Sequence, residues 1–267
     1  MQSAASDLEL IEAAARDAGA LARKLFAKPL EIKSKGEAGP VTNVDFAVND
    51  LLQARLCEAR PDYGWLSEES PDGPERLNKS RVFIIDPIDG TAAMIAKSPQ
   101  FTISIGVSDE GRAFAGAIYN PLTDEMFAGA PGVRATLNGR PIKASARSKL
   151  DGMRMVGLRH RFGRSKWPEA WPPMEIIERQ SIAYRMALVG ADMADATLLF
   201  GWKNEWDIAG GAAIVEAAGG RVSDPWGAPL RLNNPSPRTP GGVVAAGAAL
   251  HPLLIERTKH FPDPREG

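Results

Sequence analysis

RVFIIDPIDGT, at residues 81–91, joins an apolar run to two aspartates within one short stretch. The run has the composition of a buried strand, and Asp86 and Asp89 follow it before a Gly-Thr pair. Turn formation and helix capping explain one carboxylate at such a position. Two carboxylates on a tight turn repel each other and lose hydration near the core, so the second requires a cation or a proton. The stretch therefore predicts either a capped turn or a metal site.

The composition is that of a globular protein with one large domain or two ordinary ones. Of the 267 residues, 44% are hydrophobic, and 32 Lys and Arg nearly balance 33 Asp and Glu. This balance gives no indication of a nucleic-acid partner. The single Cys57 excludes an intramolecular disulfide framework and a cysteine-based zinc cluster, and the presence of only three histidines disfavours a histidine-rich metal site. A metal would therefore be held mainly by oxygen ligands.

The N-terminal segment does not resemble a signal peptide. Asp7, Glu9 and Glu12 interrupt its apolar residues, which recur at helical spacing. No apolar run in the chain approaches the ~20 residues that cross a bilayer. We therefore expect a cytoplasmic protein with no membrane partner.

Strand and helix patterns divide the chain into an α+β part (1–138) and an α/β part (139–267). In the first part we expect two helices in front of an antiparallel sheet, with a hairpin at Asn138-Gly139 marking the change of domain. The expected segments are helices at about 8–25 and 45–56, strands at 82–86, 101–107, 113–121 and 125–130, a strand at 153–158, a loop at 159–173, a short helix at 173–180 and an Ala-rich helix at 208–220.

Further acidic residues lie at the ends of predicted elements. Glu68 and Glu69 follow an apolar segment, Asp207 begins the Ala-rich helix, and Asp45 follows a loop. Each has an ordinary explanation, as a solvated loop residue or a helix cap. At element ends, however, all of them can point into one cleft together with the two aspartates of the opening stretch.

Such a cleft has the chemistry of a magnesium site. Mg²⁺ prefers carboxylate, carbonyl and water oxygens and binds substrate phosphates. Carboxylates from three segments would hold two ions about 3.5 to 4 Å apart, which activates water for phosphate-ester hydrolysis. A helix beginning near Thr91 would also direct free N–H groups at a phosphate.

Four motifs together resemble the inositol monophosphatase family of metal-dependent, lithium-sensitive phosphatases. They are VTNVD (41–45), WLSEES (65–70), DPIDGT (86–91) and WDIAGG (206–211). The resemblance spans nearly the whole chain. It implies a five-layer αβαβα sandwich, usually a homodimer, with Mg²⁺ as cofactor and inhibition by Li⁺.

The resemblance also implies roles for matched positions. The first metal is held by Glu68, Asp86, the carbonyl of Ile88 and Thr91; the second by Asp86, Asp89 and Asp207. A third, weakly held cation is recruited through Glu68, which is thereby also catalytic. Lys33 or Lys35 either assists there or lies in a solvated loop.

Water activation and phosphate binding are implied at the same turn. Asp45 pairs with Thr91 and helps to deprotonate the attacking water. The amides of Gly90 and Thr91 cradle the phosphate, and Glu69 is a supporting residue.

The wall of the cleft indicates the substrate. Inositol phosphatases carry a Glu seven residues before the metal Asp, where this chain has Phe200. FGWKNEWD (200–207) and GAPLRLNNPSP (227–237) are similar to bacterial 3'(2'),5'-bisphosphate nucleotidases of the CysQ type. Arg185 falls where those enzymes have a Lys suited to a substrate phosphate. Two departures weaken this match, Ser181-Ile182-Ala183 in place of Gly-Ser-Ser and Ala92-Ala93-Met94 after the DGT motif.

We therefore expect an enzyme that removes the 3'(2')-phosphate from adenosine 3',5'-bisphosphate. In this hypothesis Phe200 packs on the adenine and Arg185 binds the phosphate that is not cleaved. The alternatives are that Phe200 is a core aromatic and Arg185 a surface cation. Inositol-1-phosphate phosphatase activity remains an alternative function, as does a non-enzymatic RNA-associated or assembly-associated role.

Overall fold

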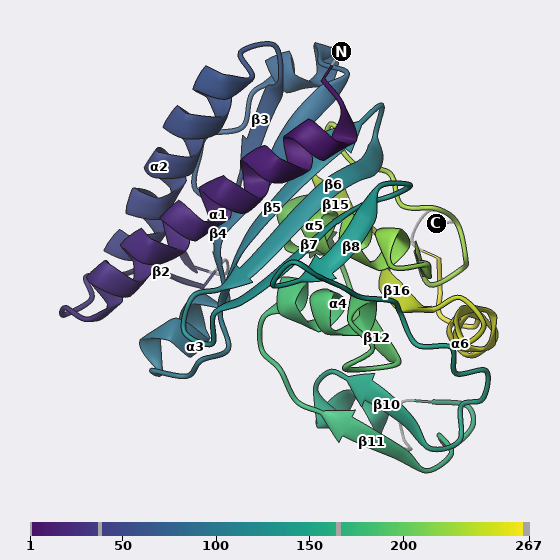
Figure 1. Cartoon of the computed structure of the whole chain (residues 1–267). Coiled ribbons are helices and arrows are strands. Elements are labelled where there is room, and N and C mark those ends of the chain that lie inside the picture. Colours follow the sequence, from purple (N-terminus) through teal and green to yellow (C-terminus); the bar gives the residue numbers. More distant parts are fainter. Residues whose placement is uncertain (1, 37–38, 164–166, 264–267) are drawn as a thin grey trace.

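Two β-sheets alternate with three helical layers in the computed structural model, which describes residues 2–36, 39–163 and 167–263. The layers are α1 (Ala4–Phe26) and α2 (Asn43–Ala59), a seven-stranded sheet, α4 (Ile182–Gly190) and α5 (Glu205–Ala217), a five-stranded sheet, and α6 (His251–Thr258) (Figure 1). Short helices are α3 (Thr91–Ile95), η2 (Pro74–Asn78) and η3 (Arg159–Phe162). The expected αβαβα sandwich is confirmed.

The seven-stranded sheet has the order β3-β4-β5-β6-β7-β8-β9. Its strands are β3 (Gly64–Ser67), β4 (Arg81–Asp89), β5 (Thr102–Asp109), β6 (Arg112–Asn120), β7 (Glu125–Ala130), β8 (Arg134–Leu137) and β9 (Arg140–Pro141). β3 is parallel to β4, and the other pairs are antiparallel. The expected antiparallel sheet behind two helices is thus correct except at the β3 edge.

Strand β4 is buried along its whole length because helices cover both faces of this sheet. Phe83 and Ile85 pack toward α1 and α2, whereas Val82 and Ile84 pack with Ala209 of α5. This alternation follows the two-residue period of a strand. Burial on both faces explains why the opening stretch reads as a continuous apolar run.

The five-stranded sheet has the order β11-β10-β12-β16-β14. Its strands are β10 (Met153–Val156), β11 (Met174–Ile177), β12 (Ala196–Phe200), β14 (Gly220–Ser223) and β16 (Gly242–Gly247), and two-stranded ribbons pair β1 (Ile32–Ser34) with β2 (Pro40–Thr42) and β13 (Lys203–Asn204) with β15 (Arg238–Thr239). The helix expected at 173–180 is wrong, because this segment forms β11. Its four residues pair in parallel with β10, and a run this short shows no decisive period.

The Asn138-Gly139 turn forms the expected hairpin, between β8 and β9. Both turn residues have positive φ, 50° and 76°, as a type I′ turn requires. The expected domain boundary at 138/139 falls inside this turn, so the first sheet takes its last strand from just beyond it.

Helix α5 packs directly on the first sheet through glycine. A Cβ at Gly116 of β6 would lie 2.2 Å from the carbonyl oxygen of Gly210. On its other side, a Cβ at Gly211 would lie 2.5 Å from Met186 of α4. These close approaches fix the second turn of α5 between the sheet and α4, directly after the turn that carries Asp207. No helix in the described ranges is long and apolar enough to cross a membrane.

Candidate active site

The predicted carboxylates lie where β3, β4 and α5 begin or end. Asp86 and Asp89 flank an irregularity in the pairing of β4 with β5, and both are buried. Glu68 directly follows β3, and Asp207 lies in the first turn of α5. The fold therefore brings three segments that are distant in sequence to one end of the first sheet.

Mutual repulsion shows that these carboxylates share one environment. Burial raises the pKa of Asp86 well above its ordinary value, and the charges of Glu68 and Asp89 raise it further. Burial also raises the pKa of Asp207 well above its ordinary value, and the charges of Asp89 and Glu68 add to this rise. Among the described residues, neither Asp86 nor Asp207 forms an ion pair. The cluster thus carries negative charge that a cation would neutralise.

The donor chemistry of the cluster fits a hard divalent cation. Its groups are carboxylate oxygens and the Ile88 carbonyl, which suit Mg²⁺ rather than a softer metal. Within residues 2–36, 39–163 and 167–263, no three acidic, His or Cys side chains form a ready-made ligand set.

Lys35 contacts the acidic pair after β3. Its Nζ lies 2.7 Å from Glu68 Oε1 and 2.6 Å from Glu69 Oε1. Burial lowers the pKa of Lys35, but the two carboxylates outweigh burial and raise it overall. The interpretation of this residue as a solvated loop lysine is wrong, whereas Lys33 is exposed on β1. Glu68 and Glu69 therefore share one ammonium group.

Asp45 and Thr91 are brought together as the resemblance implied. Thr91 Oγ1 lies 2.8 Å from Asp45 Oδ1 and 3.0 Å from the Ile88 carbonyl oxygen. The other Asp45 oxygen accepts hydrogen bonds from the backbone N–H and the hydroxyl of Thr42, which caps α2. This capping arrangement fixes the carboxylate that faces Thr91.

Gly90 is required by the turn between β4 and α3. Its φ is 100°, and a Cβ would lie 2.9 Å from the carbonyl oxygen of Gln100. A side chain is excluded at this position both by conformation and by space.

Ser181 is a positioning residue that the sequence analysis missed. Its hydroxyl caps α4 and donates to Asp89 Oδ2 at 2.6 Å, and the N–H of Ala183 donates to the same oxygen at 2.5 Å. Burial raises the pKa of Asp89, and these hydrogen bonds oppose that rise. The Ser181-Ile182-Ala183 segment weakened the match to the nucleotidases, but in the structure it orients a predicted metal ligand. Serine before an apolar helix was the available signal.

The 227–237 segment is held by Glu205, which the sequence analysis also missed. This buried carboxylate accepts hydrogen bonds from the backbone N–H groups of Asn233 and Asn234. Asn233 also binds Arg76 through its side chain. The asparagines that carried the resemblance here therefore join this segment to α5 and η2.

Arg185 lies beside the carboxylate cluster and is buried, so its interpretation as a surface cation is wrong. Its Nε donates to the carbonyl of Arg179 at 2.7 Å, and its Nη2 donates to that of Gln180 at 3.1 Å. Burial lowers the pKa of Arg185, whereas the charge of Asp89 opposes this. Arg185 lines a cavity of about 170 Å³ together with Phe200.

Phe200 belongs to an aromatic cluster as well as to this cavity. Its ring centroid lies 5.7 Å from that of Trp167, 6.0 Å from Phe261 and 6.2 Å from Phe162. The core interpretation of Phe200 therefore describes most of its contacts. An adenine would meet only the part of the ring that lines the cavity.

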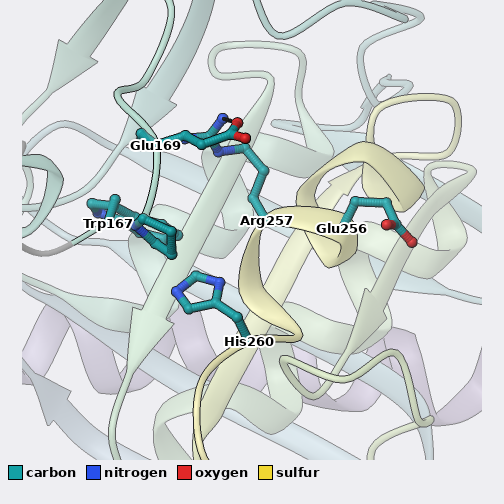
Figure 2. Close-up of a pocket in the computed structure, with 6 residues that line it drawn as sticks. Trp167, Glu169, Glu256, Arg257 and His260 are labelled. Carbon is teal, nitrogen blue, oxygen red and sulfur yellow. Dashed lines mark hydrogen bonds and ion pairs between the residues drawn. The ribbon is translucent and has the colours of Figure 1, made fainter.

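A second pocket, of about 210 Å³, lies at α6 (Figure 2). The Trp167 and His260 rings meet edge to face there, with centroids 6.0 Å apart, and Arg257 reaches toward Glu169. It contains none of the predicted site residues. The cavity beside Arg185 is therefore the better candidate for a substrate wall.

Comparison with known proteins gives the same assignment along the whole chain. The model of the inositol monophosphatase family matches residues 5–261. Inositol monophosphatase 3 from Solanum lycopersicum is 31% identical, covering 93% of this chain and 95% of its own. The 3'(2'),5'-bisphosphate nucleotidase CysQ from Escherichia coli is 30% identical, covering 81% and 89%. The crystal structure of the extragenic suppressor protein suhB from Bartonella henselae has a TM-score of 0.79 at 27% identity, covering 96% and 100%.

The fold and the acidic site together define a metal-dependent phosphatase. The chain belongs to the inositol monophosphatase family. Enzymes of this family typically use Mg²⁺ and act on small phosphorylated substrates. Relatives named for inositol phosphates and for nucleotides are about equally similar, so identity alone does not distinguish the substrates.

Proposed function

We propose that this enzyme removes the 3'(2')-phosphate from adenosine 3',5'-bisphosphate in a Mg²⁺-dependent reaction. The observation that carries the proposal is the placement of Arg185, buried in a cavity beside Asp89. Two of its guanidinium nitrogens bind backbone carbonyls, and no hydrogen bond is formed by Nη1 within the described residues. An inositol monophosphate has no second anionic group for this cation.

Bound Mg²⁺, held by Glu68, Asp86, Asp89, Asp207 and the Ile88 carbonyl, would supply Lewis acidity for water activation and charge on the phosphate. Ser181 and Ala183 keep the Asp89 carboxylate oriented. We expect two such ions, a third recruited through Glu68, and competition by Li⁺.

Thr91 and Asp45 act on the attacking water. The Thr91 hydroxyl donates to Asp45 and can accept a hydrogen bond from water, which orients a lone pair of the water toward the phosphorus. The water proton then passes toward Asp45. The amides of Gly90 and Thr91 bind the phosphate oxygens at the turn whose positive φ Gly90 permits.

The direct test compares kcat/KM for adenosine 3',5'-bisphosphate and inositol 1-phosphate at saturating Mg²⁺. We expect the bisphosphate to be preferred by at least about tenfold, the effect of one modest charged hydrogen bond. A higher kcat/KM for inositol 1-phosphate would refute the nucleotidase proposal and leave the family assignment intact.

Arg185→Lys provides a variant that keeps the charge but loses the planar guanidinium fork. It should raise KM for the bisphosphate more than KM for adenosine 3'-phosphate, which lacks the second phosphate. Its melting temperature must be measured alongside, since Arg185 also binds the carbonyls of Arg179 and Gln180. Equal changes for both substrates would remove Arg185 from the substrate site.

A further inference from the structure

Three cationic side chains line the cavity beside the acidic site. Arg161 comes from η3, Arg185 from α4 and Lys203 from β13. Within the described residues, none of the three forms an ion pair with a carboxylate. The fold thus collects positive charge from three separate segments without a matching acidic side chain in direct contact.

These cations are close enough to repel one another. Burial lowers the pKa of Lys203, and the charges of Arg161 and Arg185 lower it further, against the attraction of Asp207. The charge of Arg161 likewise lowers the pKa of Arg185. Leu158 and Leu198 form part of the cavity wall, and an apolar wall strengthens such interactions. An anion bound among the three would relieve this repulsion.

Two of the three cations have structural duties. Lys203 Nζ donates to the carbonyls of Phe200 at 2.6 Å and Trp202 at 3.0 Å, and Arg185 binds two carbonyls as described. The Arg161 side chain forms no hydrogen bond or ion pair with the described residues. No such contact with the described residues therefore explains why the Arg161 side chain lies at the cavity.

We propose that Arg161 is a specificity-determining residue, which binds the phosphate that is not hydrolysed, with Arg185 and Lys203 completing the anion site. This inference rests on the proposed function for the identity of the ligand. The cavity of about 170 Å³ is well above the ~10 to 15 Å³ that a single water molecule needs, so it has room for a phosphate group.

The position of the cavity agrees with a bridging ligand. Arg185 interacts electrostatically with Asp89, and Lys203 with Asp207, so the same cavity lies next to two predicted metal ligands. A substrate with one phosphate at the carboxylates can place its second anion among the cations. A guanidinium group can bind two oxygens of one phosphate at once. Arg161 should therefore prefer a phosphate for its geometry as well as for its charge.

The test uses adenosine 5'-monophosphate and adenosine as inhibitors of p-nitrophenyl phosphate hydrolysis by the Mg²⁺-loaded enzyme. We expect the nucleotide to inhibit at least tenfold more strongly than the nucleoside. Arg161→Gln should reduce this ratio by about tenfold, the lower end of the effect of a lost charged hydrogen bond. Arg161→Lys should restore part of the ratio, because it restores charge without the fork.

Arg159→Gln is the matched control, since Arg159 lies in the same short helix and does not line the cavity. It should leave the ratio unchanged. Equal inhibition by nucleotide and nucleoside in the wild type, or equal ratios in the Arg159 and Arg161 variants, would overturn the inference.

The same variant separates the two proposals. If the enzyme fails to hydrolyse adenosine 3',5'-bisphosphate but nucleotide inhibition depends on Arg161, the anion site stands and the proposed substrate is wrong. If the bisphosphate is hydrolysed with an unchanged KM in Arg161→Gln, the substrate stands and the anion site is wrong.

Discussion

The Thr91 hydroxyl has two neighbouring acceptors, Asp45 Oδ1 at 2.8 Å and the Ile88 carbonyl oxygen at 3.0 Å. Because it has a single proton, it can donate a strong hydrogen bond to only one of them at a time. Donation to Asp45 leaves the Ile88 carbonyl available as an ion ligand. One side chain therefore links the proposed base to the proposed metal site.

Thr91→Val should lower kcat by about 10² to 10⁴, the range for loss of a positioned proton-transfer group, with little change in KM. Thr91→Ser keeps the hydroxyl and should retain most of the activity. Steady-state kinetics on any hydrolysed phosphomonoester checks this. Wild-type kcat in the valine variant would show that the hydroxyl has no part in water activation.

Much of the site was predictable residue by residue, because its acidic residues stand at element ends within short motifs. The Asp45–Thr91 hydrogen bond was expected from the resemblance, and the structure forms it. The sequence left open whether Lys33, Lys35 or neither approaches Glu68, since Lys35 and Glu68 lie 33 residues apart and nothing local pairs them. The grouping of Arg161 with Arg185 was unpredictable for the same reason.

At the scale of elements, Asp195 joins the beginning of β12 to β10 and to the segment before it. Its carboxylate accepts hydrogen bonds from Ser145 Oγ at 2.6 Å and from Arg154 Nη2 at 2.7 Å, and it pairs with Arg147 at 3.0 Å. Burial alone would raise the pKa of Asp195, but the hydrogen bonds and charge of Arg154 outweigh it and lower the pKa to about 2.

A lowered pKa in the folded state stabilises the fold at a pH above the ordinary value of 3.8. At neutral pH the contribution to the free energy of unfolding is about 2 kcal/mol, and it is lost as pH falls from 3.8 through about 2. Asp195→Asn should therefore destabilise the protein at neutral pH by about that amount. The loss of stability on acidification should be correspondingly smaller.

Asp192→Asn is the control, because Asp192 pairs with the same Arg154 but has a side chain 54% exposed. Its effect should stay below about 0.5 kcal/mol. Denaturant unfolding at several pH values measures both variants. Equal effects of the two substitutions would contradict the role assigned to the buried carboxylate.

Element prediction succeeded where the local pattern was distinctive and failed where a segment was too short to show a period. The hairpin followed from Asn138-Gly139 because few residues adopt two successive positive φ values. Strand β11 was mistaken for a helix because its pairing with β10 is a long-range property. Local sequence did not specify that partner.

At the scale of the whole molecule, folding must bring several carboxylates together before any ion can bind. The mutual repulsion of Asp86, Asp89 and Asp207 therefore opposes folding of the metal-free protein. An ion that binds only the folded state reverses this effect, and its contribution grows with concentration. Metal binding should consequently appear as thermal stabilisation of the entire chain.

Added Mg²⁺ should raise the melting temperature of the wild-type protein. Asp207→Asn removes one charge from the cluster, so its melting temperature without metal should equal or exceed that of the wild type. The same variant should lose most of the Mg²⁺-dependent rise and most of the phosphatase activity. Differential scanning calorimetry with and without Mg²⁺ measures the stabilities. A full Mg²⁺ response in Asp207→Asn would exclude this carboxylate as an important ligand.

The most direct test of the central claim is the anomalous scattering of Mn²⁺ bound in crystals of this protein. That claim is that the carboxylates at the end of the first sheet and in α5 form one metal centre. We predict anomalous peaks between Glu68, Asp86, Asp89 and Asp207, with oxygen ligands at about 2 Å. Peaks only at other positions, or none at an Mn²⁺ concentration that supports activity, would contradict the account.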